Sequence, residues 1–316
     1  MSETVLILGA TGRFGRAAAA AFHDAGWEVR VQMRSAVPHA LPGRRVIADL
    51  DDSNMLDKAA AGAAVIVNAL NPPYDKWTEE VPRTTDQVIA LAQRSGAHVM
   101  IPGNVYNFGS NLPEVLSEAT PEVGDHKKAR IRIAMEAAYR ASGVPTLVLR
   151  AGDFIDTHPG ENWFEGQITA KLAQGRLVYP GPMDSVHAWA FLPDLARATV
   201  GLMARRDMLA QFQTVHFPGY NVTGAELARA VEAWVGPRSV RSMPWWALHL
   251  IAPFTPLMRE VLDMRYLWQR PHRIDGALFH QLLPEFKATP LEQAVRASLE
   301  GTGHLAPLGH AVRTAA

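Results

Sequence analysis

The feature that most constrains the fold is the N-terminal segment, where an apolar run breaks into a glycine turn and a helix-forming stretch follows at once. The run Thr4-Val5-Leu6-Ile7-Leu8 leads into Gly9-Ala10-Thr11-Gly12-Arg13-Phe14-Gly15-Arg16 and a series of alanines. Glycines allow a backbone to approach the phosphates of a dinucleotide, and a helix N-terminus offers free N–H groups to the anion. We therefore expect a pyrophosphate above Gly12 to Gly15. The candidate cofactor-binding residues here are Gly9, Thr11, Gly12, Arg13, Phe14 and Gly15.

The glycine spacing is Gly-x-x-Gly-x-x-Gly, with Thr11 before the middle glycine. A tight turn that only packs a helix on a sheet would also use Gly9 and Gly15, so the position between a strand and a helix is the stronger indication. The motif resembles the short-chain dehydrogenase/reductase superfamily in its extended and atypical branches, which include epimerase/dehydratase-like and NmrA-like proteins. The resemblance covers about residues 4–235, and it implies a dinucleotide cofactor on a Rossmann fold.

Short β-rich runs alternate with alanine-rich stretches through the first half of the chain. The pattern predicts strands at 5–8, 28–33, 45–48, 65–69, 98–101 and 146–150, and helices near 14–25, 53–61, 79–95 and 127–142. This is an α/β fold with a doubly wound parallel sheet, whose ligands lie outside the carboxyl ends of the strands. We expect a dinucleotide-binding core over 1–155 and a smaller substrate lobe over 156–316, with parts of about 189–220 returning to the core.

The composition suits a globular enzyme and excludes several kinds of site. The 316 residues carry 31 basic and 31 acidic side chains, so no basic field favours nucleic acid or an anionic membrane. The absence of Cys excludes disulfides and thiolate chemistry, and no histidine spacing indicates a metal. Since no targeting segment or membrane-spanning run is evident, we expect a cytoplasmic protein. Its expected partner is a small-molecule substrate, and a homodimer is one assembly open to it.

The residue after the second predicted strand bears on cofactor choice. An NAD-preferring protein usually offers an acidic group to the ribose 2′-hydroxyl there, whereas this chain has Arg34, with Arg13 also available in the glycine loop. A guanidinium can bind a 2′-phosphate through two hydrogen bonds. The alternative is a solvated surface arginine. We predict NADP in preference to NAD.

Further cofactor contacts are expected after the third and fourth strands. The resemblance implies that Asp49 binds the adenine amine, with Leu50 beside it, although a helix N-cap from this acidic segment is the competing interpretation. The fourth strand ends in Asn68-Ala69-Leu70-Asn71-Pro72-Pro73, which resembles the segment passing beneath the cofactor in the family. Asn68 and Ala69 are the candidates there, with a plain strand exit as the alternative.

The expected catalytic segment departs from the family pattern. Extended members carry a Ser or Thr after the fifth strand and Tyr-x-x-x-Lys on the next helix, but this chain has Gly103-Asn104 and then a helix without a Tyr until Tyr139. Anchoring the alignment on Glu136 puts Arg132 at the Lys position and Lys128 at the Tyr position, while another alignment keeps a Lys at Lys127. Tyr106, just beyond the fifth predicted strand, is the only phenol close to the expected nicotinamide position. The candidate acid–base and cofactor-holding residues are therefore Tyr106, Lys128 and Arg132, and a solvated basic face is the alternative for the helix.

The C-terminal lobe gives weaker indications. Asn104, Trp163 and His187 are candidate substrate-lining residues, the last two assigned to loops after the sixth strand, with ordinary packing as the alternative. The segment Trp189 to Ala198 resembles a family helix start in which Asp194 is an N-cap. Aromatics between 243 and 271 match no motif, and such residues at helical spacing usually form core.

The resemblance implies that the protein transfers a hydride from reduced NADP to a carbonyl or activated double bond of a small, partly apolar molecule. A nucleotide-sugar epimerase or dehydratase is one alternative, against which the missing Tyr counts. A regulator that senses NADP without turnover is the other, and the missing Tyr favours it.

Overall fold

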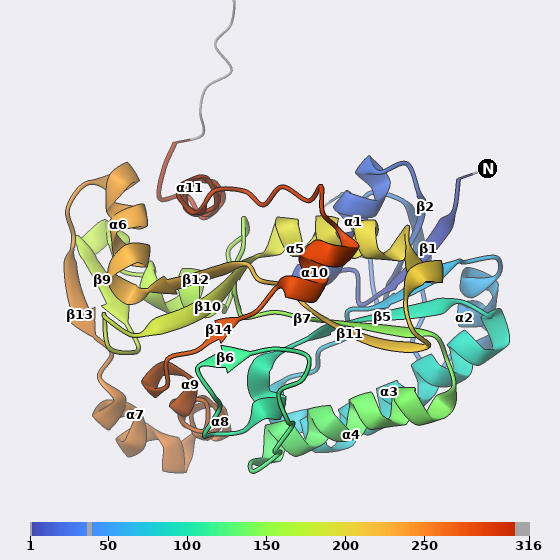
Figure 1. The fold of residues 1–316 in the computed structure, drawn as a ribbon, viewed down its shortest axis with the longest axis horizontal. Helices are drawn as coiled ribbons and strands as arrows, with labels where there is room; N and C mark the ends of the chain where they lie inside the picture. The colour runs from blue at the N-terminus through green and yellow to red at the C-terminus, as the bar shows by residue number, and fades with distance from the viewer. Residues whose placement is uncertain (1, 37–39, 307–316) are drawn as a thin grey trace, which may run out of the picture.

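The computed structural model describes residues 2–36 and 40–306, and its core is a parallel sheet between two layers of helices (Figure 1). All neighbouring strands in the sheet run parallel, in the order β11-β7-β5-β4-β1-β2-β3. The α/β Rossmann-type prediction is thereby confirmed. The strands are β1 (Thr4–Leu8), β2 (Glu28–Met33), β3 (Arg44–Ile47), β4 (Val65–Asn68), β5 (His98–Gly103), β7 (Thr146–Arg150) and β11 (Phe212–His216).

The central strands read as continuous apolar runs because helices cover both faces of the sheet. Every residue of β1, β4 and β7 is buried. One face packs on α1 (Arg13–Asp24), α5 (Leu192–Met203) and α10 (Ala277–Leu282). The other packs on α2 (Ser53–Ala60), α3 (Trp77–Ser95) and α4 (Lys127–Ser142), below the sheet in Figure 1.

Element boundaries moved slightly from those predicted. Helix α3 begins at Trp77 rather than at residue 79, because the Trp77 indole is buried and donates to the Pro72 carbonyl oxygen at 2.9 Å. A short 3₁₀ helix, η1 (Tyr74–Lys76), precedes it. The exit from β4 is thus a fixed turn.

Strand order changes direction between β1 and β4. From that point the chain builds β2 and β3 on one side and β5, β7 and β11 on the other. Ligands of such sheets lie across this point, outside the carboxyl ends of the strands. We call the part of this edge formed by β1, β2 and β3 the β1–β3 side, and the part formed by β4, β5 and β7 the β4–β7 side.

The smaller lobe lies at the other end of the molecule (left in Figure 1). Strands β8 (Asp153–Ile155), β10 (Val186–Phe191) and β12 (Tyr220–Thr223) form one sheet, and two strand pairs join β9 (Arg176–Tyr179) to β13 (Ser239–Ser242) and β6 (Val115–Leu116) to β14 (Arg273–Ile274). Its helices are α6 (Gly224–Val235), α7 (Trp245–Ile251), α8 (Pro256–Leu262), α9 (Tyr266–Gln269) and α11 (Leu291–Gly301). The shorter helical turns are η2 (Val105–Phe108), η3 (Trp163–Ile168), η4 (Leu172–Gln174), η5 (Arg206–Met208) and η6 (Ala252–Phe254).

The two parts exchange chain segments. Helix α5 packs on α1, and β11 is an edge strand of the main sheet, although both follow the first strands of the lobe. Within the lobe, Trp245 and Trp268 from the aromatic segment are buried in its core, whereas Trp246 is exposed. Among the described residues, no helix is long and apolar enough to cross a membrane.

Asp194 does not cap α5 as expected. The N-cap of that helix is Phe191, which leaves Asp194 in the first turn, buried. Its carboxylate accepts from the Thr289 backbone N–H at 2.6 Å and the Thr289 hydroxyl at 2.8 Å. It also pairs with Arg197 of the same helix at 2.6 Å. Through Thr289, the aspartate ties the segment before α11 to the core.

Candidate functional site

The glycine loop joins β1 to α1 through a backbone shape that requires glycine. Gly9 has φ +72°, in the left-handed region that side chains other than glycine rarely adopt. Its N–H donates to Oε1 of buried Gln32 at 3.0 Å, and a Cβ there would lie 3.1 Å from the Ala69 carbonyl oxygen. Gly9 thus sets the approach of β1 to β4.

Gly15 and Gly12 serve different purposes. A Cβ on Gly15 would lie 2.3 Å from the Gly9 carbonyl oxygen, so this residue is needed for α1 to pack against the loop. Gly12 is the exposed N-cap of α1, with an ordinary φ of −70°, and no side chain caps the helix. Because the helix dipole and uncapped N–H groups open outward here, the geometry fits a dinucleotide pyrophosphate in the space that a side chain on Gly12 would fill.

The other loop candidates divide between core and surface. Phe14 is buried in the core beneath the sheet-facing side of α1, so only its backbone can reach an anion. The Thr11 carbonyl accepts from Arg16 at 3.4 Å, and Arg16 also lies 3.8 Å from the Asp156 carboxylate of the lobe. Arg13 reaches the same lobe segment, with its Nη1 3.4 Å from the Cβ position of Gly160.

The β1–β3 side carries Arg34 beyond the end of β2. Arg34 is exposed, and no hydrogen bond or ion pair joins it to another residue that the structure describes. Asp49 is also exposed and accepts from the Asp51 N–H at 3.1 Å, whereas Asp52 caps α2. Leu50 packs against the core. The Arg34 guanidinium and the Asp49 carboxylate thus both face solvent beyond the strand ends on this side.

Asn68 and Ala69 end up in different environments. The Asn68 amide donates to the Tyr139 hydroxyl at 3.0 Å, and its oxygen accepts from the Leu70 N–H at 3.2 Å. The Asn68 side chain thus points into the core, between β4 and α4. Ala69 borders the glycine loop through its carbonyl oxygen near Gly9.

The β4–β7 side brings two phenols together. The Tyr106 hydroxyl, from η2 after β5, lies 3.1 Å from the Tyr74 hydroxyl, from η1 after β4. Asn104 fixes η2, because its side-chain oxygen accepts from the Tyr106 N–H at 3.0 Å. Burial raises the pKa of both phenols, well above the ordinary value for Tyr106, so both are protonated at neutral pH.

The two basic candidates on α4 are buried rather than solvated. Lys128, 2% exposed, forms an ion pair with Glu260 of α8, and its ammonium lies 5.3 Å from the centre of the Tyr74 ring. Arg132 donates to the Pro102 carbonyl oxygen at 2.5 Å and lies over the Trp77 ring. The basic-face alternative is therefore wrong for these two residues, although Lys127 and Arg130 are exposed.

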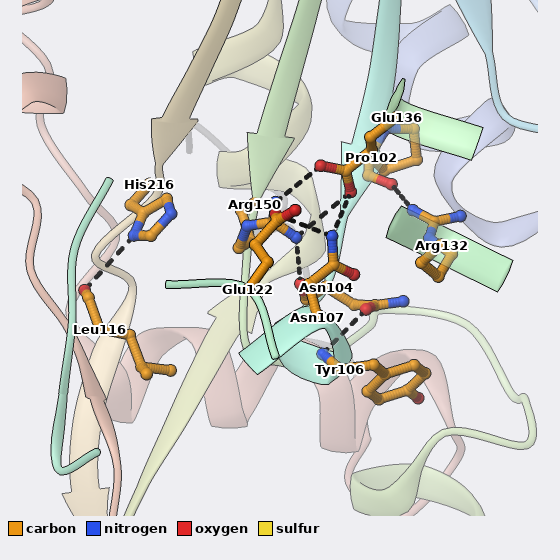
Figure 2. A network of polar contacts seen from close by, with 10 residues as sticks. All are labelled: Pro102, Asn104, Tyr106, Asn107, Leu116, Glu122, Arg132, Glu136, Arg150 and His216. Carbon is orange, nitrogen blue, oxygen red and sulfur yellow. Dashed lines mark hydrogen bonds and ion pairs between the residues drawn. The ribbon is translucent and has the colours of Figure 1, made fainter. Parts of the chain in front are cut away.

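A buried ion network lies under the β4–β7 side, between β5, β7 and α4 (Figure 2). Arg150, 1% exposed, donates to Glu136 and to Glu122, both at 2.8 Å, and to the Asn104 carbonyl oxygen at 2.6 Å. The Asn107 amide also donates to both carboxylates, at 2.9 and 3.0 Å. The network fixes the backbone that presents Asn104 and Tyr106. Beside it, burial lowers the pKa of His216 to about 4, so that imidazole is neutral.

The lobe contributes an Asp–His pair. His187 lies on β10 and not in a loop, because its strand pairs with β8 and β12. Its Nε2 is 2.7 Å from the Asp153 carboxylate, and its ring stacks on Trp268 at 4.1 Å between centroids. Trp163 is likewise in a helical turn, η3, where it packs on Trp268 and Trp245. His187 and Trp163 thus sit in one aromatic cluster.

The structure adds residues that the sequence did not indicate. Tyr74 and Asp153 come shortly after the ends of β4 and β7, so their places beyond strand ends were the available signal. The sequence contains no signal for Glu260, because its partner Lys128 lies 132 positions away. Among the described residues, no group of three or more His, Asp or Glu side chains converges as a metal site requires.

Comparisons with known proteins agree with this geometry. A model of the NmrA-like family matches residues 1–243. The fold resembles L-threonine dehydrogenase from Clostridium difficile, with a TM-score of 0.76 at 16% identity over 96% of this chain and 98% of that one. It also resembles UDP-N-acetylglucosamine 4-epimerase from Bacillus cereus, with a TM-score of 0.73 at 13% identity over 94% of this chain and 99% of that one. A third similar structure is UDP-glucose 4-epimerase from Bifidobacterium longum, with a TM-score of 0.71 at 15% identity over 95% of this chain and 98% of that one. No curated protein matched the sequence.

Proposed function

Because this chain belongs to the NmrA-like family of atypical short-chain dehydrogenase/reductases, we propose that it binds NADP and reduces a small, partly apolar molecule at a carbonyl or activated double bond. Gly12 carries the proposal. It is an exposed helix N-cap without a capping side chain, at the point where strand order reverses. The dinucleotide would span the edge, with its adenosine on the β1–β3 side and its nicotinamide on the β4–β7 side.

The preference for NADP rests on Arg34. Its guanidinium is exposed beyond β2, where the ribose 2′-group of the dinucleotide is held in such folds. A 2′-phosphate would gain charge-assisted hydrogen bonds from it, whereas a bare hydroxyl would gain little. Arg13, against Gly160, adds positive charge on the opposite flank of the glycine loop.

On the β4–β7 side, the bound dinucleotide would supply a hydride, and the chain would supply the surroundings of the reacting carbon. Tyr74, Tyr106 and Asp153 present two hydroxyls and a carboxylate there. The aromatic cluster around Trp163 and Trp268 provides apolar surface in the adjoining lobe. This combination suits a small substrate with one polar, reducible group on an apolar body.

Calorimetric titration with NADPH and NADH tests the proposal. NADPH is expected to bind more tightly, and Arg34→Ala should reduce that preference by about 1.5–3 kcal/mol, roughly 10- to 100-fold, because a charge-assisted contact is lost. Arg44→Ala is the matched control, since this exposed arginine begins β3 at the amino edge of the sheet. Equal affinities for both cofactors in the unmodified protein would refute the preference, and binding by a folded Gly12→Val protein would refute the proposed pyrophosphate site.

The second candidate function is an NADP-sensing regulator without turnover. The observation that favours it is the ion pair between Lys128 and Glu260, which occupies the side chain at the family Tyr position. Such a protein would bind NADPH and NADP⁺ differently and change its affinity for a protein partner accordingly. Reduction of any small aldehyde or ketone at the expense of NADPH would exclude this candidate.

A further inference from the structure

Tyr74 places a phenol near the carboxyl end of β4, in the turn that leads to α3. It opens η1 directly after the Pro72-Pro73 exit from β4, and the Trp77 indole fixes that exit by donating to the Pro72 carbonyl oxygen. The Tyr74 and Trp77 rings pack at 5.1 Å between centroids. The phenol is therefore held in position at the carboxyl end of β4, next to the point where strand order reverses.

The hydrogen bond between Tyr74 and Tyr106 leaves one hydroxyl hydrogen free. Tyr106 is 9% exposed, and its hydroxyl lies 3.1 Å from that of Tyr74. Tyr74 is half-buried. When Tyr106 donates, the Tyr74 oxygen accepts, and the Tyr74 O–H is left to point at a ligand.

Charged groups from three elements surround this pair. Lys128 lies over the Tyr74 ring, and Arg132 of α4 and Arg13 of α1 add positive charge, while Asp153 of β8 adds negative charge. Burial raises the pKa of Tyr74, the Tyr106 hydrogen bond and the two arginines lower it, and Asp153 raises it. The phenol is thus neutral at pH 7, with cations placed to stabilise its anion.

Other candidates for a proton donor are engaged elsewhere. Lys128 is engaged in the ion pair with Glu260 of α8. Tyr139, the phenol on α4, is fully buried and bonded to Asn68. Tyr106 is the more buried of the two phenols, and its hydroxyl lies against that of Tyr74.

Resting on the proposed function, we propose that Tyr74 is the proton donor of the reaction, so that η1 supplies the phenol that α4 lacks. In carbonyl reduction, the substrate carbon takes the hydride while its oxygen takes the Tyr74 hydrogen, and the phenol O–H bond breaks. Tyr106 donates to the phenolate that remains, and Lys128 and Arg132 stabilise its charge. Water returns the proton as the alcohol leaves.

The test is the ionisation of Tyr74 in solution. The chain has six tyrosines, so protein labelled with ¹³C at tyrosine Cζ gives a small set of signals that Tyr→Phe variants assign. Titration with NADP⁺, whose ring is positive, should lower the Tyr74 pKa by about one unit, whereas NADPH, whose ring is neutral, should not. Tyr106→Phe should raise the Tyr74 pKa by removing the donor. Tyr220→Phe, whose hydroxyl contacts the Thr289 carbonyl, is the control that leaves the response unchanged.

The outcomes separate this inference from the proposed function. If calorimetry shows NADP⁺ binding and the Tyr74 signal does not respond, Tyr74 is not beside the nicotinamide and the inference is wrong. If the signal of another tyrosine responds instead, that residue takes its place. If neither NADP⁺ nor NADPH binds, the proposed function fails first, and the inference falls with it.

Discussion

The β1–β3 side and the β4–β7 side, at the carboxyl edge of the main sheet, are built in different ways. The β1–β3 side depends on backbone shape, with Gly9, Gly12 and Gly15 lying within one short turn. The β4–β7 side depends on side chains from η1, η2, α4, β8 and α8, whose contacts join residues as distant as Lys128 and Glu260. A binding surface made of backbone can be recognised in a local motif, whereas one assembled from separate elements depends on the whole fold.

The largest expected effect is on the buried network under the β4–β7 side. Replacing Arg150 by Met leaves Glu136 buried without its cation, because that carboxylate lies between β7 and α4. We expect a loss of about 3–5 kcal/mol in the free energy of unfolding, measured with urea. Arg140→Met, which removes an exposed cation over the Phe212 ring, should cost far less. Equal losses in the free energy of unfolding for the two variants would show that the buried network does not stabilise this side more than an exposed arginine does.

The next effect concerns the lobe segment that contacts the glycine loop. Burial raises the pKa of Glu165 to about 7, beside Asp156, which pairs with Arg16. A raised carboxyl pKa means that the folded protein holds the proton more tightly, so stability falls as pH rises from about 4.5 through 7. Glu165→Gln removes this fall and should gain on the order of 3 kcal/mol over the unmodified protein between pH 5 and pH 8.

Exposed Glu161→Gln is the control for Glu165→Gln, and its unfolding profile with pH should match that of the unmodified protein. Parallel profiles for all three proteins would mean that Glu165 ionises normally. In that case, the contact between the lobe and the glycine loop would not depend on this carboxyl group.

A smaller effect distinguishes two glycines of the β1–β3 side. A Cβ on Gly15 would meet the Gly9 carbonyl oxygen at 2.3 Å, so Gly15→Ala should destabilise the fold by about 1–3 kcal/mol. A Cβ on Gly12 would lie 3.2 Å from that oxygen, so Gly12→Ala should unfold close to the normal temperature and still weaken NADPH binding. Thermal unfolding and calorimetry compare them. Similar melting temperatures for the Gly15→Ala and Gly12→Ala proteins would show that the two glycines do not differ in their importance for the fold.

The contrast between the sides also explains what the sequence could predict. The parallel sheet and the glycine loop were predictable because apolar runs, glycine spacing and helix starts are local signals. His187 and Trp163 were expected in loops, yet pairing with β8 and β12 places His187 in a strand, and packing on Trp245 and Trp268 places Trp163 in a helical turn.

Partners across the fold were beyond the reach of the sequence. The basic run on α4 resembles a solvated face, and only the position of α8 shows that Lys128 is buried against Glu260. Tyr74 belongs to a short turn without a motif, and its meeting with Tyr106 depends on β4 and β5 being neighbours. The contact between Tyr74 and Tyr106 and the ion pair between Lys128 and Glu260 therefore had to be found in the structure.

The most direct measurement is a crystal structure of the protein with NADP⁺ bound. We predict that the pyrophosphate lies within hydrogen-bond distance of the backbone N–H groups at the start of α1, with the 2′-phosphate at Arg34. The nicotinamide should lie beside the Tyr74 hydroxyl on the β4–β7 side. A dinucleotide bound away from Gly12, or a nicotinamide with Tyr74 out of reach of its reacting carbon, would contradict the division of the edge into these two sides.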